Sequence, residues 1–158
     1  MTTAVSAPLI FESYLDARYR DELEDLFYFN SNQAVVREEM ERAIDLFGIP
    51  EIVEASGRLT FQLRGGQAVQ TLFALEEISG EKHLAGVIIY ARTDDLTLSL
   101  IHIAVSEAEF LSEQLPRNRL TSAMFDCVFN IARKIKGLER IHFLYGKKSQ
   151  YIKLRKSS

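Results

Sequence analysis

The stretch QLPRNR, Gln114 to Arg119, combines residue types that can hold an anion, and it lies where apolar strands give way to an amphipathic helix. Arginine guanidinium groups form forked hydrogen bonds to phosphate and carboxylate oxygens. The first turn of a helix adds unsatisfied N–H donors and a partial positive charge. We therefore expect an anion site at this junction. Its residues would be Gln114, Arg117, Asn118, Arg119, Leu120 and Thr121. The alternative is that the junction is only a well-solvated helix start.

Two side chains before this junction could move a proton. His102 interrupts an otherwise apolar strand, and the usual histidine pKa of about 6.5 suits a general base at neutral pH. An isolated strand histidine is more often a hydrogen-bonded core or sheet residue. Glu107, just past the strand, is a second candidate base, although acidic residues are common in loops. The three histidines show no spacing typical of a metal site, so no metal is expected.

Periodicity predicts the elements that position these residues. Apolar residues at helical spacing predict two helices within 16–47, with Asp16 as N-cap of the first, and a long helix over 118–136. Gly48 and Gly137 are placed to end the second and third helices. Apolar runs predict strands over 59–64, 69–77, 84–92 and 96–105 as a four-stranded antiparallel meander, with Gly65-Gly66 as its first hairpin turn. Short strands over 139–146 and 151–155 complete a single α+β domain spanning 1–158.

This order of two helices, a meander whose last strand enters a long helix, and a following strand resembles the GNAT acyltransferase superfamily. In that family the turn before the long helix carries a Q/R-x-x-G-x-G/A motif, whose backbone N–H groups hold the pyrophosphate of acetyl-CoA. Gln114 matches the first position, whereas Arg117 and Arg119 stand at the two glycine positions. The segment EAEFLSE also lengthens the turn before Gln114. The resemblance implies acetyl-CoA or another acyl-CoA as cofactor. Either the two arginines hold its phosphates through their guanidinium groups, or nothing is held there.

The resemblance also implies an activity and an alternative to it. Such a protein would transfer an acyl group to the amine of a small molecule or protein, with His102 or Glu107 as base. Many family members protonate the leaving thiolate with a tyrosine, and Tyr145 stands at the end of the strand that follows the long helix. The alternative is that Tyr145 is only an aromatic residue at the end of a strand, where tyrosines are common. The alternative is a GNAT-like binding or assembly module that has lost CoA binding and could form a homo-oligomer. The missing glycine pair and the short C-terminal part motivate this alternative.

Charge is distributed unevenly along the chain. From Arg133 to the end there are nine basic residues and one acidic residue, so this part carries +8 and the rest carries −11. Such a split can favour an anionic partner, although lysines near a terminus also serve solubility alone. The sequence pI of about 5.7 argues against a dedicated nucleic-acid-binding protein.

Composition indicates a folded, soluble protein, because 47% of the residues are hydrophobic and 26% are charged. No run approaches the ~18 consecutive apolar residues of a membrane span, and no basic region precedes the short apolar stretch near the N-terminus. The single cysteine, Cys127, occupies an apolar position of the long helix and is expected to be a packed core thiol. We expect a cytoplasmic protein.

Overall fold

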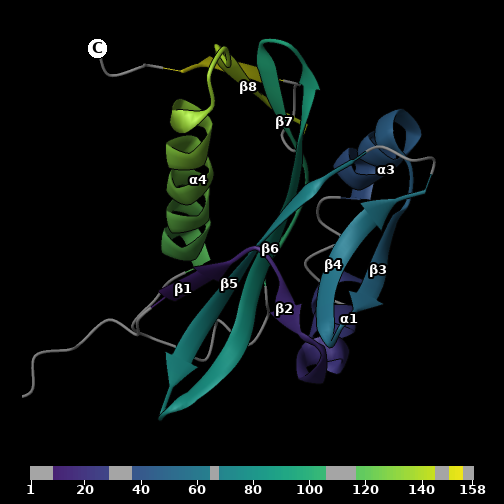
Figure 1. Cartoon of the computed structure of the whole chain (residues 1–158), viewed down its shortest axis with the longest axis vertical. Coiled ribbons are helices and arrows are strands. Elements are labelled where there is room, and N and C mark those ends of the chain that lie inside the picture. Colours follow the sequence, from purple (N-terminus) through teal and green to yellow (C-terminus); the bar gives the residue numbers. More distant parts are fainter. Residues whose placement is uncertain (1–8, 29–36, 65–67, 106–116, 145–149, 155–158) are drawn as a thin grey trace, which may run out of the picture.

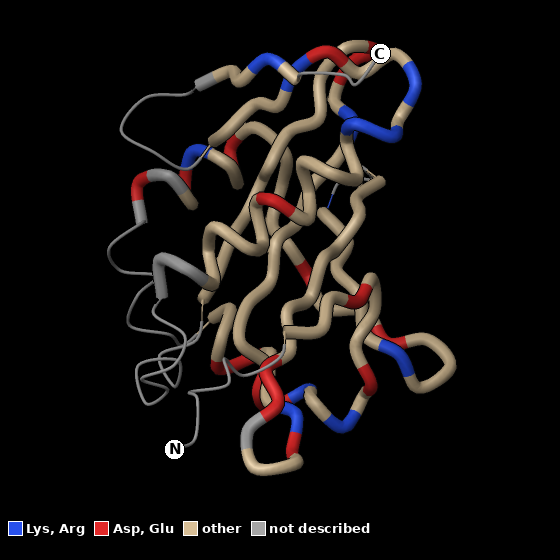
Figure 2. Tube along the Cα trace, turned by 90° about the vertical axis from the view of Figure 1, so that its left-hand side faces the viewer, with Lys and Arg blue, Asp and Glu red and all other residues tan. Residues whose placement is uncertain are grey.

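The computed structural model describes residues 9–28, 37–64, 68–105, 117–144 and 150–154. These residues form three α-helices, a short 3-10 helix, a six-stranded mixed sheet and a three-stranded antiparallel sheet (Figure 1). The α+β class is confirmed, as is the order of two N-terminal helices, a meander, a long helix and C-terminal strands. In the described part, no helix has the length and apolar composition needed to cross a membrane. Charged residues gather mainly at the two ends of the molecule (Figure 2).

The larger sheet has the strand order β1-β5-β6-β7-β8-β9. Neighbouring strands are antiparallel except β7 and β8, which run parallel. The strands are β1 (Leu9–Glu12), β5 (Gln70–Ile78), β6 (Glu81–Asp94), β7 (Thr97–Val105), β8 (Arg140–Phe143) and β9 (Gln150–Lys153). The middle of β6, residues 84–91, is buried throughout. Its continuous apolar run follows from this position, because other elements cover both faces of the sheet there.

The smaller sheet corrects one prediction. β4 (Arg58–Leu63) pairs with β3 (Pro50–Ala55) and with β2 (Leu15–Asp16), in the order β2-β4-β3. It does not pair with β5, so the meander of the larger sheet has three strands, and the predicted hairpin between β4 and β5 is wrong. Its glycine turn falls in 65–67, outside the described residues. The alternating apolar residues of β4 instead pack against the larger sheet, where Phe61 lies 6.5 Å from Phe73 between ring centroids.

The N-terminal helices lie on the same side of the larger sheet as the smaller sheet (Figure 1). The carboxylate of Asp16 accepts a hydrogen bond from the N–H of Arg18 at 2.9 Å, which caps the 3-10 turn Ala17–Tyr19 before α1 (Arg20–Phe27). The second helix is α3 (Arg37–Phe47), and the earlier part of its predicted range lies outside the described residues. Gly48 ends α3 at a φ of +99°, and its N–H bonds the carbonyl of Ile44 at 2.8 Å.

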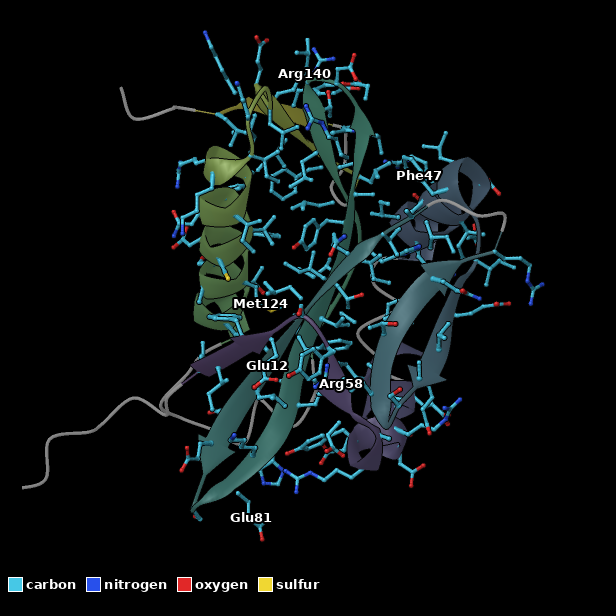
Figure 3. The ribbon with its side chains drawn as sticks, in the orientation of Figure 1. Glu12, Phe47, Arg58, Glu81, Met124 and Arg140 are labelled. Carbon is cyan, nitrogen blue, oxygen red and sulfur yellow. The ribbon has the colours of Figure 1, made fainter. Side chains whose placement is uncertain are left out.

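The long helix α4 (Arg117–Lys134) covers the opposite face of the larger sheet (Figure 1). Every fourth residue from Leu120 onward is fully buried, namely Leu120, Met124, Val128 and Ala132. A Cβ atom at Gly86 would come within 2.7 Å of the Met124 sulfur, so this glycine permits the close approach of α4 to β6 (Figure 3). Cys127 is partly buried against the same core, and its burial raises the pKa of the thiol.

Candidate functional site

The predicted anion site depends on the unit formed by β7, α4 and β8. Thr97–Leu100 of β7 pair in parallel with residues 140–143 of β8. Because two parallel neighbours are joined by α4, the helix must run antiparallel to both strands. Its first turn therefore lies toward the carboxyl end of β7, where β7 continues for five residues past its last pair with β8.

The first turn of α4 contains most of the residues assigned to anion binding. Arg117, Asn118 and Arg119 are its first three residues, and N–H groups at this position of a helix lack intrahelical acceptors. Leu120 is fully buried in the core, so only its backbone could contact a ligand. Thr121 is partly exposed. Three further predicted site residues lie outside the described part: Glu107, Gln114 and Tyr145.

A β-bulge in β7 sets the orientation of His102. Ile89 of β6 pairs with His102, whereas the next residue, Tyr90, pairs with Leu100, so Ile101 is the extra residue in β7. Ile101 and His102 consequently both face the side covered by α1 and α3, where Ile101 packs in an apolar cluster. Bulges of this kind re-aim side chains and are frequent beside functional sites.

His102 lies within the core between the larger sheet and α1. It is 1% exposed, and its ring meets the ring of Phe27 edge to face with 5.8 Å between centroids. Burial lowers the pKa of His102 from 6.5 to about 4, because desolvation disfavours the charged imidazolium. The imidazole is therefore neutral at pH 7, as a base must be, but an acceptor could reach it only if α1 moved. The burial agrees with the alternative interpretation, a core histidine.

Glu76 of β5 is a charged residue that the sequence analysis missed. It is 2% exposed, and among the described residues nothing hydrogen-bonds its Oε1 atom. The side chains of Leu72 and Ala74 lie on the same face of β5 as Glu76 and pack beneath α4. On the neighbouring strand β1, Leu9 lies directly opposite Glu76. The sequence does contain a signal for this burial, because Glu76 occupies a position where the alternation of the strand calls for an apolar residue on the buried face.

Glu76 lies toward the end of the sheet where α4 begins. Ala74 of β5 pairs with Gly86, and Gly86 lies against Met124 of α4. Glu76 follows two residues later along β5, which runs in the same direction as β7 and therefore toward the end where α4 begins. A buried polar oxygen without a partner costs stability and calls for an explanation such as a bound group. Glu76 is therefore a candidate for holding a cationic group, for instance an amine.

His142 belongs to a separate group of side chains on β8 and β9. Its ring stacks on Tyr151 with 4.3 Å between centroids, and the Arg140 guanidinium lies 4.9 Å from the Tyr151 ring centroid. Arg140 Nε donates a hydrogen bond to Thr97 Oγ1 at 2.7 Å. Partial burial, with the positive charge of Arg140, lowers the pKa of His142. These contacts fix the edge strand β9 to the rest of the sheet.

Among the described residues, no group of three or more histidine, cysteine, aspartate or glutamate side chains could hold a metal ion. No protein-family model, curated protein or solved structure matches this chain. Its function therefore has to be inferred from the arrangement of its own residues.

Proposed function

We propose that the chain binds an acyl-CoA at the junction of β7 and α4 and acts as an N-acyltransferase of the GNAT type. One observation carries the proposal. β7 and β8 are parallel, pair over only four residues and are joined by α4. The first turn of α4 lies toward the carboxyl end of β7, beyond the last residue of β7 that pairs with β8. Ligands of α/β folds bind characteristically at the carboxyl ends of parallel strands, next to a helix N-terminus. The order of elements is also the one on which the resemblance to GNAT proteins rests.

The proposed roles follow from this geometry. The first-turn N–H groups of α4, with the side chains of Arg117 and Arg119, would hold the CoA phosphates. The acceptor amine would attack the thioester carbonyl, with His102 or Glu107 taking its proton and Tyr145 returning a proton to the CoA thiolate. Among these, His102 would act only after α1 had uncovered it.

A thermal-shift titration with acetyl-CoA tests the proposal. Ligand at about 100 times its dissociation constant should stabilise the native state by about 2.7 kcal/mol. The double variant Arg117→Ala with Arg119→Ala should lose this stabilisation. A matched control is Arg18→Ala with Arg20→Ala, since these exposed arginines have the same spacing at the start of another helix. Equal shifts in the two double variants would refute the site.

The burial of His102 and Leu120 favours a second candidate function, a binding or assembly module of the same fold without a cofactor. Both side chains are at most 1% exposed, so two predicted site residues are also core residues. A stable oligomer in solution, without any thermal shift from acetyl-CoA or CoA, would favour this candidate. Tight CoA binding by a monomer would exclude it.

A further inference from the structure

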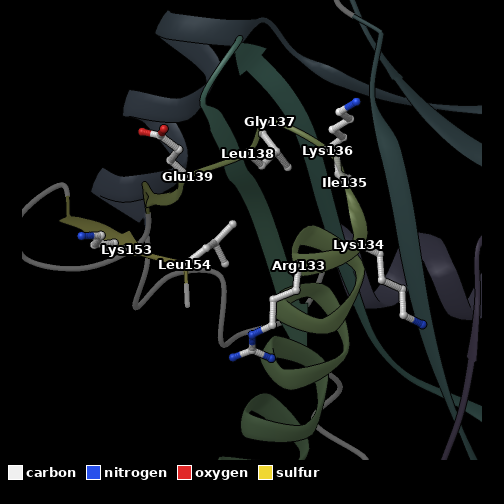
Figure 4. Close-up of a pocket in the computed structure, with 9 residues that line it drawn as sticks. All are labelled: Arg133, Lys134, Ile135, Lys136, Gly137, Leu138, Glu139, Lys153 and Leu154. Atoms are coloured by element: carbon white, nitrogen blue, oxygen red, sulfur yellow. The ribbon is translucent and has the colours of Figure 1, made fainter. Parts of the chain in front are cut away.

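A pocket lies at the other end of α4 from the junction described above. Its volume is about 620 Å³, and it forms where the last turn of α4, the connection to β8 and the end of β9 meet (Figure 4). Pockets of this size accommodate small molecules. Its lining residues are Arg133, Lys134, Ile135, Lys136, Gly137, Leu138, Glu139, Lys153 and Leu154. Since α4 has 18 residues, this pocket lies about 27 Å from the first turn of the helix.

The pocket carries an excess of positive charge. Four of its lining residues are basic and one, Glu139, is acidic. Lys134, Lys136 and Lys153 form no ion pair with any described residue, and Arg133 donates only to the side-chain oxygen of Asn130, at 2.7 Å. Several cations held together without acidic partners raise the local concentration of anions.

Some carbonyl groups at and just after the end of α4 already have hydrogen-bond donors. The carbonyl of Ala132 accepts the N–H of Ile135 at 3.1 Å, and the carbonyl of Ile135 accepts the N–H of Leu138 at 3.5 Å. The carbonyl of Lys136 accepts a hydrogen bond from Arg92 Nη2 at 3.4 Å. None of these three carbonyls takes its donor from a basic side chain of the pocket.

Two of the cations flank an apolar surface. Arg133 comes from α4 and Lys153 from β9, and Figure 4 shows both on the side of the turn where Leu154 lies, with their charged ends pointing in different directions, while Lys134 and Lys136 extend on the other side. Leu154 is 7% exposed and gives the pocket a fixed apolar surface, whereas the side chain of Leu138 is fully buried. A guanidinium fork and an ammonium point charge are suited to binding one phosphate together.

We propose that this pocket binds a phosphorylated small molecule, with its phosphate between Arg133 and Lys153 and its less polar part over Leu154. The site is independent of the proposed acyl-CoA site at the other end of α4. The phosphate could belong to a soluble molecule or to an anionic lipid headgroup. The two sources share this chemistry, and the experiment separates them.

The test is a titration of isotopically labelled protein with inorganic pyrophosphate, followed by amide chemical shifts at Gly137, Leu138 and Leu154. The double variant Arg133→Gln with Lys153→Gln should bind at least about tenfold more weakly, as expected when charge-assisted hydrogen bonds are lost. The control, Arg58→Gln with Lys82→Gln, removes the same charge at the end of the molecule away from the pocket, near the Arg58 and Glu81 labels of Figure 3. It should bind as the wild type does. Lys153→Gln alone serves if the double variant does not fold.

A second arm uses phosphatidylcholine vesicles with and without phosphatidic acid. Binding to the phosphatidic acid vesicles alone would assign the phosphate to a lipid headgroup, and binding to pyrophosphate alone would assign it to a soluble ligand. No saturable binding in either arm, or equal weakening in the pocket and control variants, would overturn the proposal. Acetyl-CoA stabilisation should survive Arg133→Gln with Lys153→Gln, so failure of this site and failure of the acyl-CoA site are distinguishable.

Discussion

Replacing His102 with glutamine should remove part of the acid sensitivity of the folded state. His102 is buried and neutral in the native structure, with its pKa lowered from 6.5 to about 4 by desolvation. In the unfolded chain it would protonate near its ordinary pKa. Between these two pKa values the unfolded state binds the extra proton, so the free energy of unfolding must fall as the pH falls. Glutamine is similar in size and polar, and it does not titrate.

The size of the effect follows from the two pKa values. A difference of one pKa unit corresponds to about 1.36 kcal/mol, so the whole window from pH 6.5 to 4 is worth about 3 kcal/mol. Between pH 7 and pH 5, linkage gives a loss of about 2 kcal/mol that is due to His102 alone. For a domain of this size, about 2 kcal/mol at the midpoint corresponds to a fall in Tm of several degrees.

Urea unfolding at pH 7 and pH 5 measures this loss. Wild type should lose about 2 kcal/mol more than His102→Gln between the two pH values. His83→Gln is the matched control, because it removes a histidine whose side chain is 44% exposed and leaves His102 in place. It should retain the His102-dependent loss. If wild type and His102→Gln lost the same amount, the packing of a neutral His102 against Phe27 would be refuted.

Two further predictions concern the stability of variants at Glu76 and at Gly48. Glu76→Met should raise the free energy of unfolding by about 1–3 kcal/mol, because it removes a buried oxygen without a hydrogen-bond partner in the described structure. Glu77→Met, at the neighbouring and less buried position, should bring no such gain in urea unfolding, and equal gains would contradict the placement of Glu76. Gly48→Ala should destabilise more than Gly80→Ala, although both glycines have positive φ, because a Cβ at Gly48 would overlap the carbonyl oxygen of Arg64 whereas none is near Gly80. Gly80→Ala should cost about 1 kcal/mol from backbone strain alone, and an equal loss of Tm in both variants would contradict the contact between Gly48 and the backbone of Arg64.

Local patterns in the sequence predicted the helices and the meander, but not the partner of β4. The alternation of Leu59, Phe61 and Leu63 correctly indicates a strand with one buried face. It does not say whether that strand pairs with β3 or with β5, since pairing is a non-local choice between two available edges. β3 itself begins with a proline and carries two glutamates, both of which weaken a strand signal.

The sequence predicted those parts of the candidate site that a single continuous segment forms, and not those that need contacts between distant segments. Helical periodicity predicted the start of the long helix at residue 118, one residue after its observed start at Arg117. The burial of His102 depended on a bulge at Ile101 and on α1, and neither is visible in the pattern of β7 alone. The basic pocket needed the pairing of β9 with β8, which brings Lys153 beside the end of α4.

The helix dipole of α4 favours some of the charged residues near its two ends but not others. A helix dipole favours anions near its first turn and cations near its last, each by about 0.3–1 kcal/mol. Arg133 and Lys134 lie in the last turn, where the dipole favours positive charge. It does not account for Lys153, which comes from β9, or for Glu76, whose burial costs more than the dipole returns. The proposed phosphate would interact with Lys153, and a bound cationic group would interact with Glu76.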